Sequence, residues 1–93
     1  MRESTRKVID EAVEVLREAG AREVYVFGSA AEAVDAPGSD IDFAVRGIPA
    51  NAFYETVGKL LRTLTRDFDM IDLDTPTPFA EYLQRKGKLL RVA

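Results

Sequence analysis

Two aspartates separated by one residue are the most chemically suggestive pair in this 93-residue sequence, which contains neither histidine nor cysteine. Asp40 and Asp42 open an apolar run, residues 41–45, that is typical of a β-strand. Side chains two apart on a strand project from the same face, so the two carboxylates are expected side by side. Such a pair suits Mg²⁺ or Mn²⁺, because hard cations prefer oxygen ligands and relieve the repulsion. A bare pair is nevertheless more often two solvent-facing acids at a strand end.

A second feature gives the acidic pair more weight. Gly28 and Ser29 directly follow the β-branched and aromatic run 23–27, where a strand is expected to end in a turn. Glycine lets the backbone approach a ligand closely, and N–H groups at the start of a helical turn bind phosphate oxygens. The two features together indicate a phosphate-binding turn facing a carboxylate metal site. That combination is used for the transfer of nucleotidyl or phosphoryl groups.

The spacing of these residues resembles a known signature. Gly28-Ser29, ten further residues and then Asp40-x-Asp42 is similar to the pattern of the nucleotidyltransferase superfamily, which includes DNA polymerase β and kanamycin nucleotidyltransferase. The phrase at residues 39–42, Ser-Asp-Ile-Asp, resembles that of the minimal nucleotidyltransferases (MNT proteins) of bacteria and archaea. The resemblance covers roughly residues 24–92, nearly the whole chain.

This resemblance implies one minimal nucleotidyltransferase domain over residues 1–93, and it implies roles for particular residues. Asp40 and Asp42 would hold two Mg²⁺ ions, and Gly28 and Ser29 would bind the outer phosphates of ATP. Asp69 would bind the second metal and orient or deprotonate an acceptor hydroxyl. The resemblance further implies a HEPN-domain toxin as the partner, with a tyrosine of the toxin receiving AMP and this protein acting as the antitoxin.

The third carboxylate is open between two residues. Asp69 matches the family position, just before the apolar run, and Asp72 is the reserve. The two have opposite parity, so a regular strand cannot point both at one site. The neighbouring Asp67 and Asp74 are most simply acids at the strand ends.

The turn after Gly28-Ser29 departs from the family pattern. Many relatives continue with a basic residue and a second glycine, whereas residues 30–33 here are Ala-Ala-Glu-Ala. The turn therefore lacks a cation for the triphosphate, and Glu32 would oppose it if its side chain pointed inward. Arg22, Arg46 or a side chain from a partner are the candidates to compensate. This departure keeps a second hypothesis open, a catalytically weak or inactive MNT-fold module that neutralises its partner by contact alone. A third is an ordinary acidic α/β domain without a site.

The elements that position these residues alternate between helix and strand. Apolar periodicity predicts helices at residues 4–19, from Asn51 to about Leu64, and from Pro78 to just before Gly87. Ser4, Asn51 and Thr77 are the expected caps. Strands are expected at 23–27, 41–45, 68–73 and 89–92, and residues 28–39 form a loop with one helical turn. The predicted class is α/β, a small mixed sheet of three to four strands packed against helices.

Composition limits the remaining functions. Thirteen Lys and Arg against sixteen Asp and Glu give a net charge of −3 with the basic residues scattered, which makes nucleic acid an unlikely partner. No apolar stretch is long enough for a membrane span, and no signal-peptide core is present, so a cytoplasmic location is expected. A homodimer stays possible. The exposed side of the second helix, expected to include Tyr54, Arg62 and Arg66, is the candidate surface for a protein partner.

Overall fold

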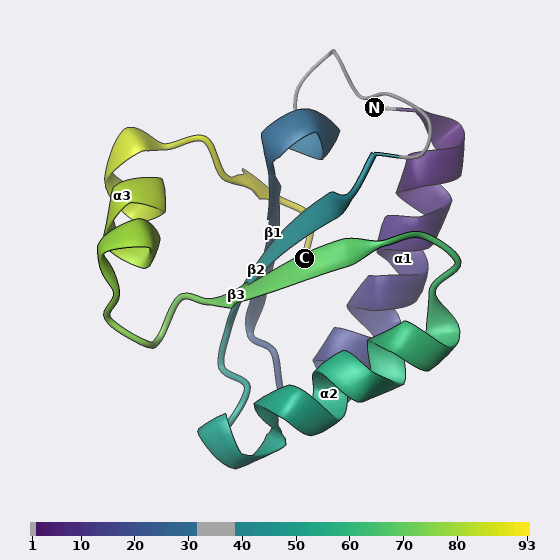
Figure 1. Ribbon diagram of the computed structural model, residues 1–93, viewed down its shortest axis with the longest axis horizontal. Coiled ribbons are helices and arrows are strands. Elements are labelled where there is room, and N and C mark those ends of the chain that lie inside the picture. Colours follow the sequence, from purple (N-terminus) through teal and green to yellow (C-terminus); the bar gives the residue numbers. More distant parts are fainter. Residues whose placement is uncertain (1, 32–38) are drawn as a thin grey trace.

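The computed structural model describes residues 2–31 and 39–93, and of Ser29 it describes the backbone only. Within these residues the chain forms three α-helices, one short 3₁₀ helix and four strands (Figure 1). In chain order these elements are α1 (Glu3–Glu18), β1 (Glu23–Phe27), η1 (Gly28–Ala31), β2 (Ile41–Arg46), α2 (Ala50–Thr63), β3 (Phe68–Asp72), α3 (Pro78–Lys86) and β4 (Leu90–Arg91).

The four strands form one mixed sheet in the order β3-β2-β1-β4. Strand β1 is antiparallel to both β2 and β4, whereas β2 and β3 are parallel. The parallel pair requires a crossover, and α2 provides it. The predicted α/β class with a small mixed sheet is confirmed, and the sheet has four strands among the described residues.

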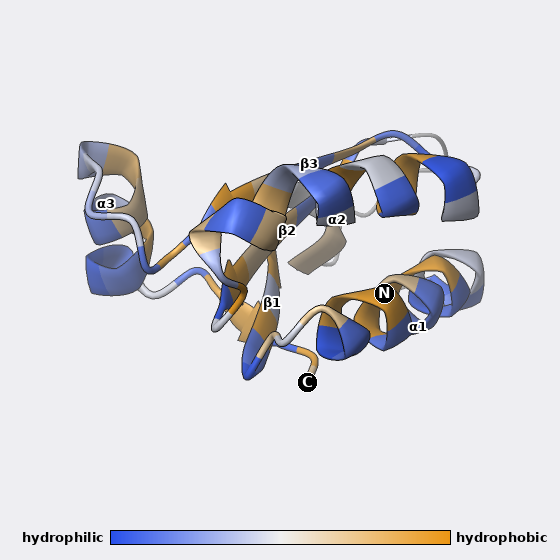
Figure 2. Cartoon of the chain, turned by 90° about the horizontal axis from the view of Figure 1, so that it is seen from below, coloured by the Kyte–Doolittle hydropathy of each residue, from blue (hydrophilic) through white to orange (hydrophobic). Residues whose placement is uncertain are grey.

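Helices cover the two faces of the sheet unequally. The long helices α1 and α2 lie on one side and α3 lies on the other (Figure 2). The first face carries the larger core, because the alternating apolar residues of the two central strands all point to it: Val24, Val26, Ile41, Phe43 and Val45, each fully buried. The second face carries a smaller cluster around Ala44, Leu73 and Ala80, next to α3. Much of this second face is therefore not covered by a helix, so a functional site has room there.

Two of the three predicted helix caps are wrong. Helix α1 begins at Glu3 with Arg2 as its N-cap residue, two residues too early for Ser4 to cap it. Helix α2 begins at Ala50, because the extended backbone of Pro49 already provides the N-cap position, which places Asn51 inside the first turn. The third cap is confirmed, since the Thr77 hydroxyl accepts a hydrogen bond of 3.1 Å from the Ala80 N–H.

The predicted partner surface on the second helix is only partly correct. Tyr54 is 83% exposed on α2, and Arg62 is exposed as well. Arg66 instead lies beyond the end of α2, where its guanidinium donates to the Thr5 hydroxyl and to the Ser39 carbonyl oxygen. Leu61, another large apolar residue of α2, is 67% exposed. In the part of the chain that the structure describes, no helix combines the length and the apolar character that crossing a membrane requires.

Candidate active site

The register of the sheet brings two of the predicted site residues together. Asp42 on β2 is the direct partner of Asp69 on β3, and on its other side it is the partner of Phe27, the last residue of β1. Register partners in neighbouring strands project from the same face, so both carboxylates emerge on the face that α1 and α2 do not cover. We call this region, where β1 ends and β2 and β3 begin, the acid end of the sheet. It comprises Gly28, Asp40, Asp42 and Asp69.

Gly28 lies directly against the carboxylate of Asp42. Its backbone has φ +70°, a conformation that residues with a side chain rarely adopt. A β-carbon at this position would lie only 2.5 Å from Oδ2 of Asp42. Glycine at residue 28 therefore serves two purposes. It allows the turn into η1, and it leaves the space that the carboxylate occupies.

The electrostatics of the acid end are unfavourable for charge. Burial raises the pKa of the Asp42 carboxyl above its usual value, and the carboxylates of Asp69 and Asp40 raise it further. No basic side chain among residues 2–31 and 39–93 forms a salt bridge with any of these three aspartates. A cation placed beside Asp42 would favour its charged form and so offset both causes of the shift. Hard oxygens with no salt-bridge partner among the described residues are a donor set that a divalent ion fits.

Asp40 is placed differently from the prediction. Strand β2 begins at Ile41, so Asp40 precedes the regular strand, and its exposed side chain lines a hollow of about 300 Å³ together with Arg66, Asp67 and other residues of the α2–β3 connection. It is near enough to raise the pKa of Asp42, yet it does not lie side by side with it on the sheet. Among the residues described, no three acidic side chains are gathered closely enough to enclose one ion.

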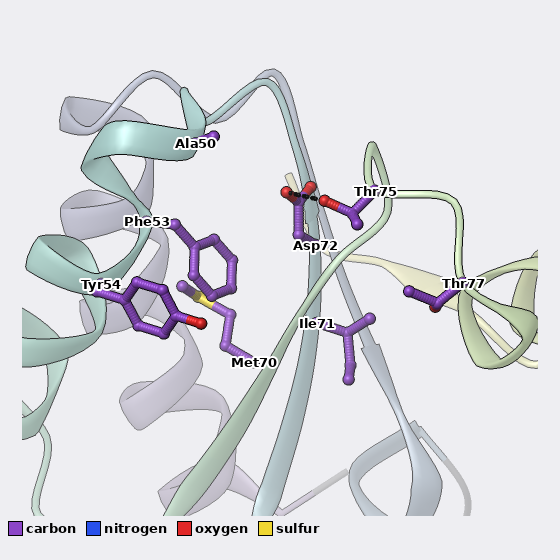
Figure 3. A pocket seen from close by; sticks show the side chains of 8 residues that line it. All are labelled: Ala50, Phe53, Tyr54, Met70, Ile71, Asp72, Thr75 and Thr77. Carbon is purple, nitrogen blue, oxygen red and sulfur yellow. Dashed lines mark hydrogen bonds between the residues drawn. The ribbon is translucent and has the colours of Figure 1, made fainter.

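The reserve candidate for the third carboxylate, Asp72, has another role. Its Oδ2 accepts a hydrogen bond of 2.9 Å from the Thr75 hydroxyl, drawn as the dashed line in Figure 3, and its Oδ1 accepts one of 2.9 Å from the Asp74 N–H. Asp72 thus closes the turn after β3, on the rim of a 340 Å³ hollow that Tyr54 and Phe53 of α2 also line (Figure 3). Asp69 is the one of the two that is the register partner of Asp42.

Neither arginine expected to compensate for the missing cation lies at the acid end. Arg46 is four residues beyond Asp42 on β2, roughly 13 Å along the strand. There its guanidinium forms salt bridges with the carboxylates of Asp74 at 3.3 Å and Glu23 at 3.8 Å, and it donates a hydrogen bond to the side-chain oxygen of Gln84. Arg22 precedes β1 and donates its backbone N–H to Arg46, so it lies at that same opposite end.

The turn that begins at Gly28 packs against the main core and has no charged residue over positions 28–31. Residues 28–31 form η1, which confirms the expected helical turn, and Ala30 is 1% exposed within the main core. A basic side chain at position 30 would have to enter that core. Glu32 and Ala33, the other two residues of the departure from the family pattern, lie outside the described residues.

Sequence reasoning missed the positioning role of Arg66. Its guanidinium ties the residue before Asp40 to helix α1, through the Ser39 carbonyl and the buried Thr5 hydroxyl. This holds the entry into β2 in place. Because Thr5 and Arg66 are 61 residues apart in the chain, no local pattern could have revealed the contact.

Comparison with known proteins gives one family and a consistent set of structures. The profile of the family described as polymerase beta, nucleotidyltransferase, matches residues 10–92. No curated protein matches the sequence at a significant level. A chain in the crystal structure of a toxin–antitoxin pair with AMP-PNP is 25% identical with a TM-score of 0.69, over 88% of this chain and 69% of that one.

Two further structures are from Shewanella oneidensis. A chain in the complex of a tri-AMPylated HEPN toxin with an MNT antitoxin is 26% identical with a TM-score of 0.58, over 78% of this chain and 59% of that one. Another is 18% identical with a TM-score of 0.64 and covers all of this chain and 72% of its own, a likeness of fold. Because the family profile spans most of the sequence and the fold agrees with it, this chain belongs to the polymerase β nucleotidyltransferase family.

Proposed function

We propose that this protein transfers AMP from ATP to a hydroxyl group of a HEPN-type partner, with Mg²⁺, and acts as the antitoxin of that partner. The observation that carries the proposal is the close approach of Gly28 to Asp42 together with the register pairing of Asp42 and Asp69. The family supports nucleotidyl transfer as the reaction class. The similar chains in complexes with AMP-PNP and with an AMPylated HEPN toxin support ATP as the donor and a protein as the acceptor.

The residues at the acid end fit divalent ions. Asp40 and Asp42 are the proposed principal ligands, and Asp69 is the proposed ligand of a second ion. Asp40 is exposed and precedes the strand, so its side chain can change rotamer rapidly on binding. When bound, such ions neutralise the triphosphate and the charge that develops on the leaving group. Mn²⁺ has similar preferences and is expected to substitute.

The remaining roles fall to the chain itself. Gly28 and Ser29 are proposed to bind the outer phosphates, because the backbone there turns closely past Asp42. Asp69 is exposed and is proposed to accept the proton of the acceptor hydroxyl. The acceptor oxygen then forms a bond to the α-phosphorus, the bond from this phosphorus to the bridging oxygen breaks, and pyrophosphate leaves with that electron pair.

A second function has its own supporting observation. The described residues hold no set of three converging acids, and η1 carries no basic side chain. A module that inhibits its partner by contact alone would need neither feature. On this alternative, the exposed aromatic and basic residues Tyr54 and Arg62 of α2 would bind the partner. Loss of the acidic side chains would then leave inhibition intact.

Incubation with ATP labelled at the α-phosphate, Mg²⁺ and the HEPN-type partner distinguishes the two functions. Transfer predicts label on the partner, no label with Asp40→Asn/Asp42→Asn, and an active toxin in the presence of that variant. If label never reaches the partner while the double variant still binds and inhibits it, contact alone is the function.

A further inference from the structure

A basic residue between α3 and β4 lies near η1. Strand β4 is antiparallel to β1, with Val26 opposite Leu90. Lys88 lies two residues before the start of β4, and Gly28 directly follows the end of β1, so both lie at the same end of this antiparallel strand pair. Phe27 and Leu89, which border this end, pack in one cluster. A lysine that is 60 residues away in sequence is thus brought to the end of β1 where η1 begins.

A surface hollow joins Lys88 to the turn. It has a volume of about 330 Å³ and is lined by Ala31 of η1 and by residues 87–90. Gly87 ends α3 in the left-handed conformation, with φ +67°, and so directs the chain from the helix into this hollow. Lys88 is exposed and forms no hydrogen bond or salt bridge with any residue of the described part of the chain. Its ammonium group is therefore available to a ligand.

The other basic residues of this region are hydrogen-bonded elsewhere or lie farther from η1. Arg66 is bonded to Thr5 and Ser39. Arg91 lies opposite Tyr25, three strand positions farther from Gly28 than Lys88 is. Lys86 is in the last turn of α3 and does not line the hollow. Lys88 is the basic residue of the α3–β4 segment that adjoins η1.

We propose that the ammonium group of Lys88 binds the outer phosphates of the nucleoside triphosphate, in place of the basic residue that the turn itself lacks. This inference rests on the proposed function, since it assumes that the triphosphate lies at Gly28. A lysine suits the role because its flexible stem carries a compact charge that can follow a mobile phosphate. The triphosphate then lies between carboxylate-bound cations on one side and Lys88 on the other.

The test is the affinity of the 93-residue protein for MgATP, measured by titration calorimetry for the wild type, Lys88→Gln, Lys88→Arg and Lys86→Gln. Removing one charge-assisted contact at an exposed site is expected to weaken binding about tenfold in Lys88→Gln. Lys88→Arg is expected to keep most of the affinity. Lys86→Gln removes the same charge two residues away and is expected to stay within about twofold of the wild type. The salt dependence of binding should also become shallower in Lys88→Gln and not in Lys86→Gln.

The outcomes separate this inference from the function on which it rests. If the wild type binds MgATP and Lys88→Gln binds it equally well, the role of Lys88 is wrong and the proposed function stands. Equal weakening in Lys86→Gln and Lys88→Gln would reduce the effect to overall charge and would also overturn the assignment. A wild type that fails to bind MgATP overturns the proposed function and this inference with it.

Discussion

The two ends of the sheet treat their charged side chains in opposite ways. At the end where β2 finishes, Arg46 contacts Asp74, Glu23 and Gln84, and the Gly47 N–H donates a hydrogen bond of 2.7 Å to Asp74. At the acid end, Asp42 and Asp69 stand beside each other with no basic partner from the described residues. The charges of the first end are paired with one another, whereas those of the second have no basic salt-bridge partner among the described residues.

This contrast separates charges that are paired within the fold from charges that lack a salt-bridge partner among the described residues. Opposite charges that lie together at a surface interact favourably and contribute modestly to folding stability. A carboxyl whose pKa is raised by burial and by neighbouring carboxylates, as that of Asp42 is, is typical of functional sites. The substitutions below are expected to affect activity at one end and stability at the other.

The largest effect is expected from Asp69→Asn compared with Asp72→Asn. Loss of the proposed proton acceptor and metal ligand should lower AMP transfer by about a hundredfold to a thousandfold. Asp72→Asn replaces one of the two acceptor oxygens that hold the turn, on the other side of the strand, so it should cost about 1 kcal/mol of folding stability and leave transfer nearly unchanged. Transfer rates and chemical denaturation of both variants check this. Greater loss of activity in Asp72→Asn would reverse the assignment of the third carboxylate.

The next prediction compares two glycines that both have a φ angle near +70°. Gly28→Ala and Gly87→Ala both place a β-carbon at positive φ, which costs about 1 to 2 kcal/mol. Only at Gly28 does the added carbon meet Asp42, whereas at Gly87 nothing lies within 4 Å. Gly28→Ala should therefore lose about tenfold or more of its transfer activity through the displaced carboxylate, beyond its loss of stability. Equal activity in the two folded variants would show that the contact at Gly28 has no part in the reaction.

At the opposite end of the sheet, Arg46→Gln should affect the fold and not the chemistry. The side chain is partly exposed, so loss of its contacts is expected to destabilise the protein by about 1 kcal/mol. Its affinity for MgATP should equal that of the wild type. A clear loss of nucleotide binding in a variant that folds normally would mean that the two ends do not have separate roles.

The smallest expected effect is a gain in stability. The folded-state pKa of Asp42 is raised, so its stabilising contribution is present at low pH and is lost as the pH rises through that raised value. Asp42→Asn should accordingly melt roughly 2 to 5 °C above the wild type at neutral pH without divalent ions. The difference should shrink at pH values where the wild-type carboxyl is protonated. A variant that is less stable at neutral pH would contradict the view that Asp42 is held against its preference.

Much of this arrangement follows from local patterns in the sequence. Alternation identified β1 and β2 to within one residue, and the opposite parity of Asp69 and Asp72 already showed that the two cannot share one face. Thr77, Pro78 and Gly87 define α3, because a cap, a fixed φ and a left-handed glycine each act within one turn.

The remaining features depend on contacts between distant segments. Ser4 and Asn51 are good capping residues, yet the N-cap of each helix lies two residues earlier, at Arg2 and at Pro49. The contacts of Arg66 and the proposed role of Lys88 depend on segments tens of positions apart in sequence that the fold brings together. The isolation of the acid end from Arg46 likewise becomes visible only once the strands have a register.

Thermal unfolding with Mg²⁺ and ATP, separately and together, tests most directly whether the acid end is a nucleotide site. At ligand concentrations about a hundred times Kd, the melting temperature of the wild type should rise by roughly 10 °C when both are present. Arg46→Gln should show the same rise, and Asp40→Asn/Asp42→Asn should show none. The absence of any rise in the wild type, or an equal rise in the double variant, would contradict the assignment.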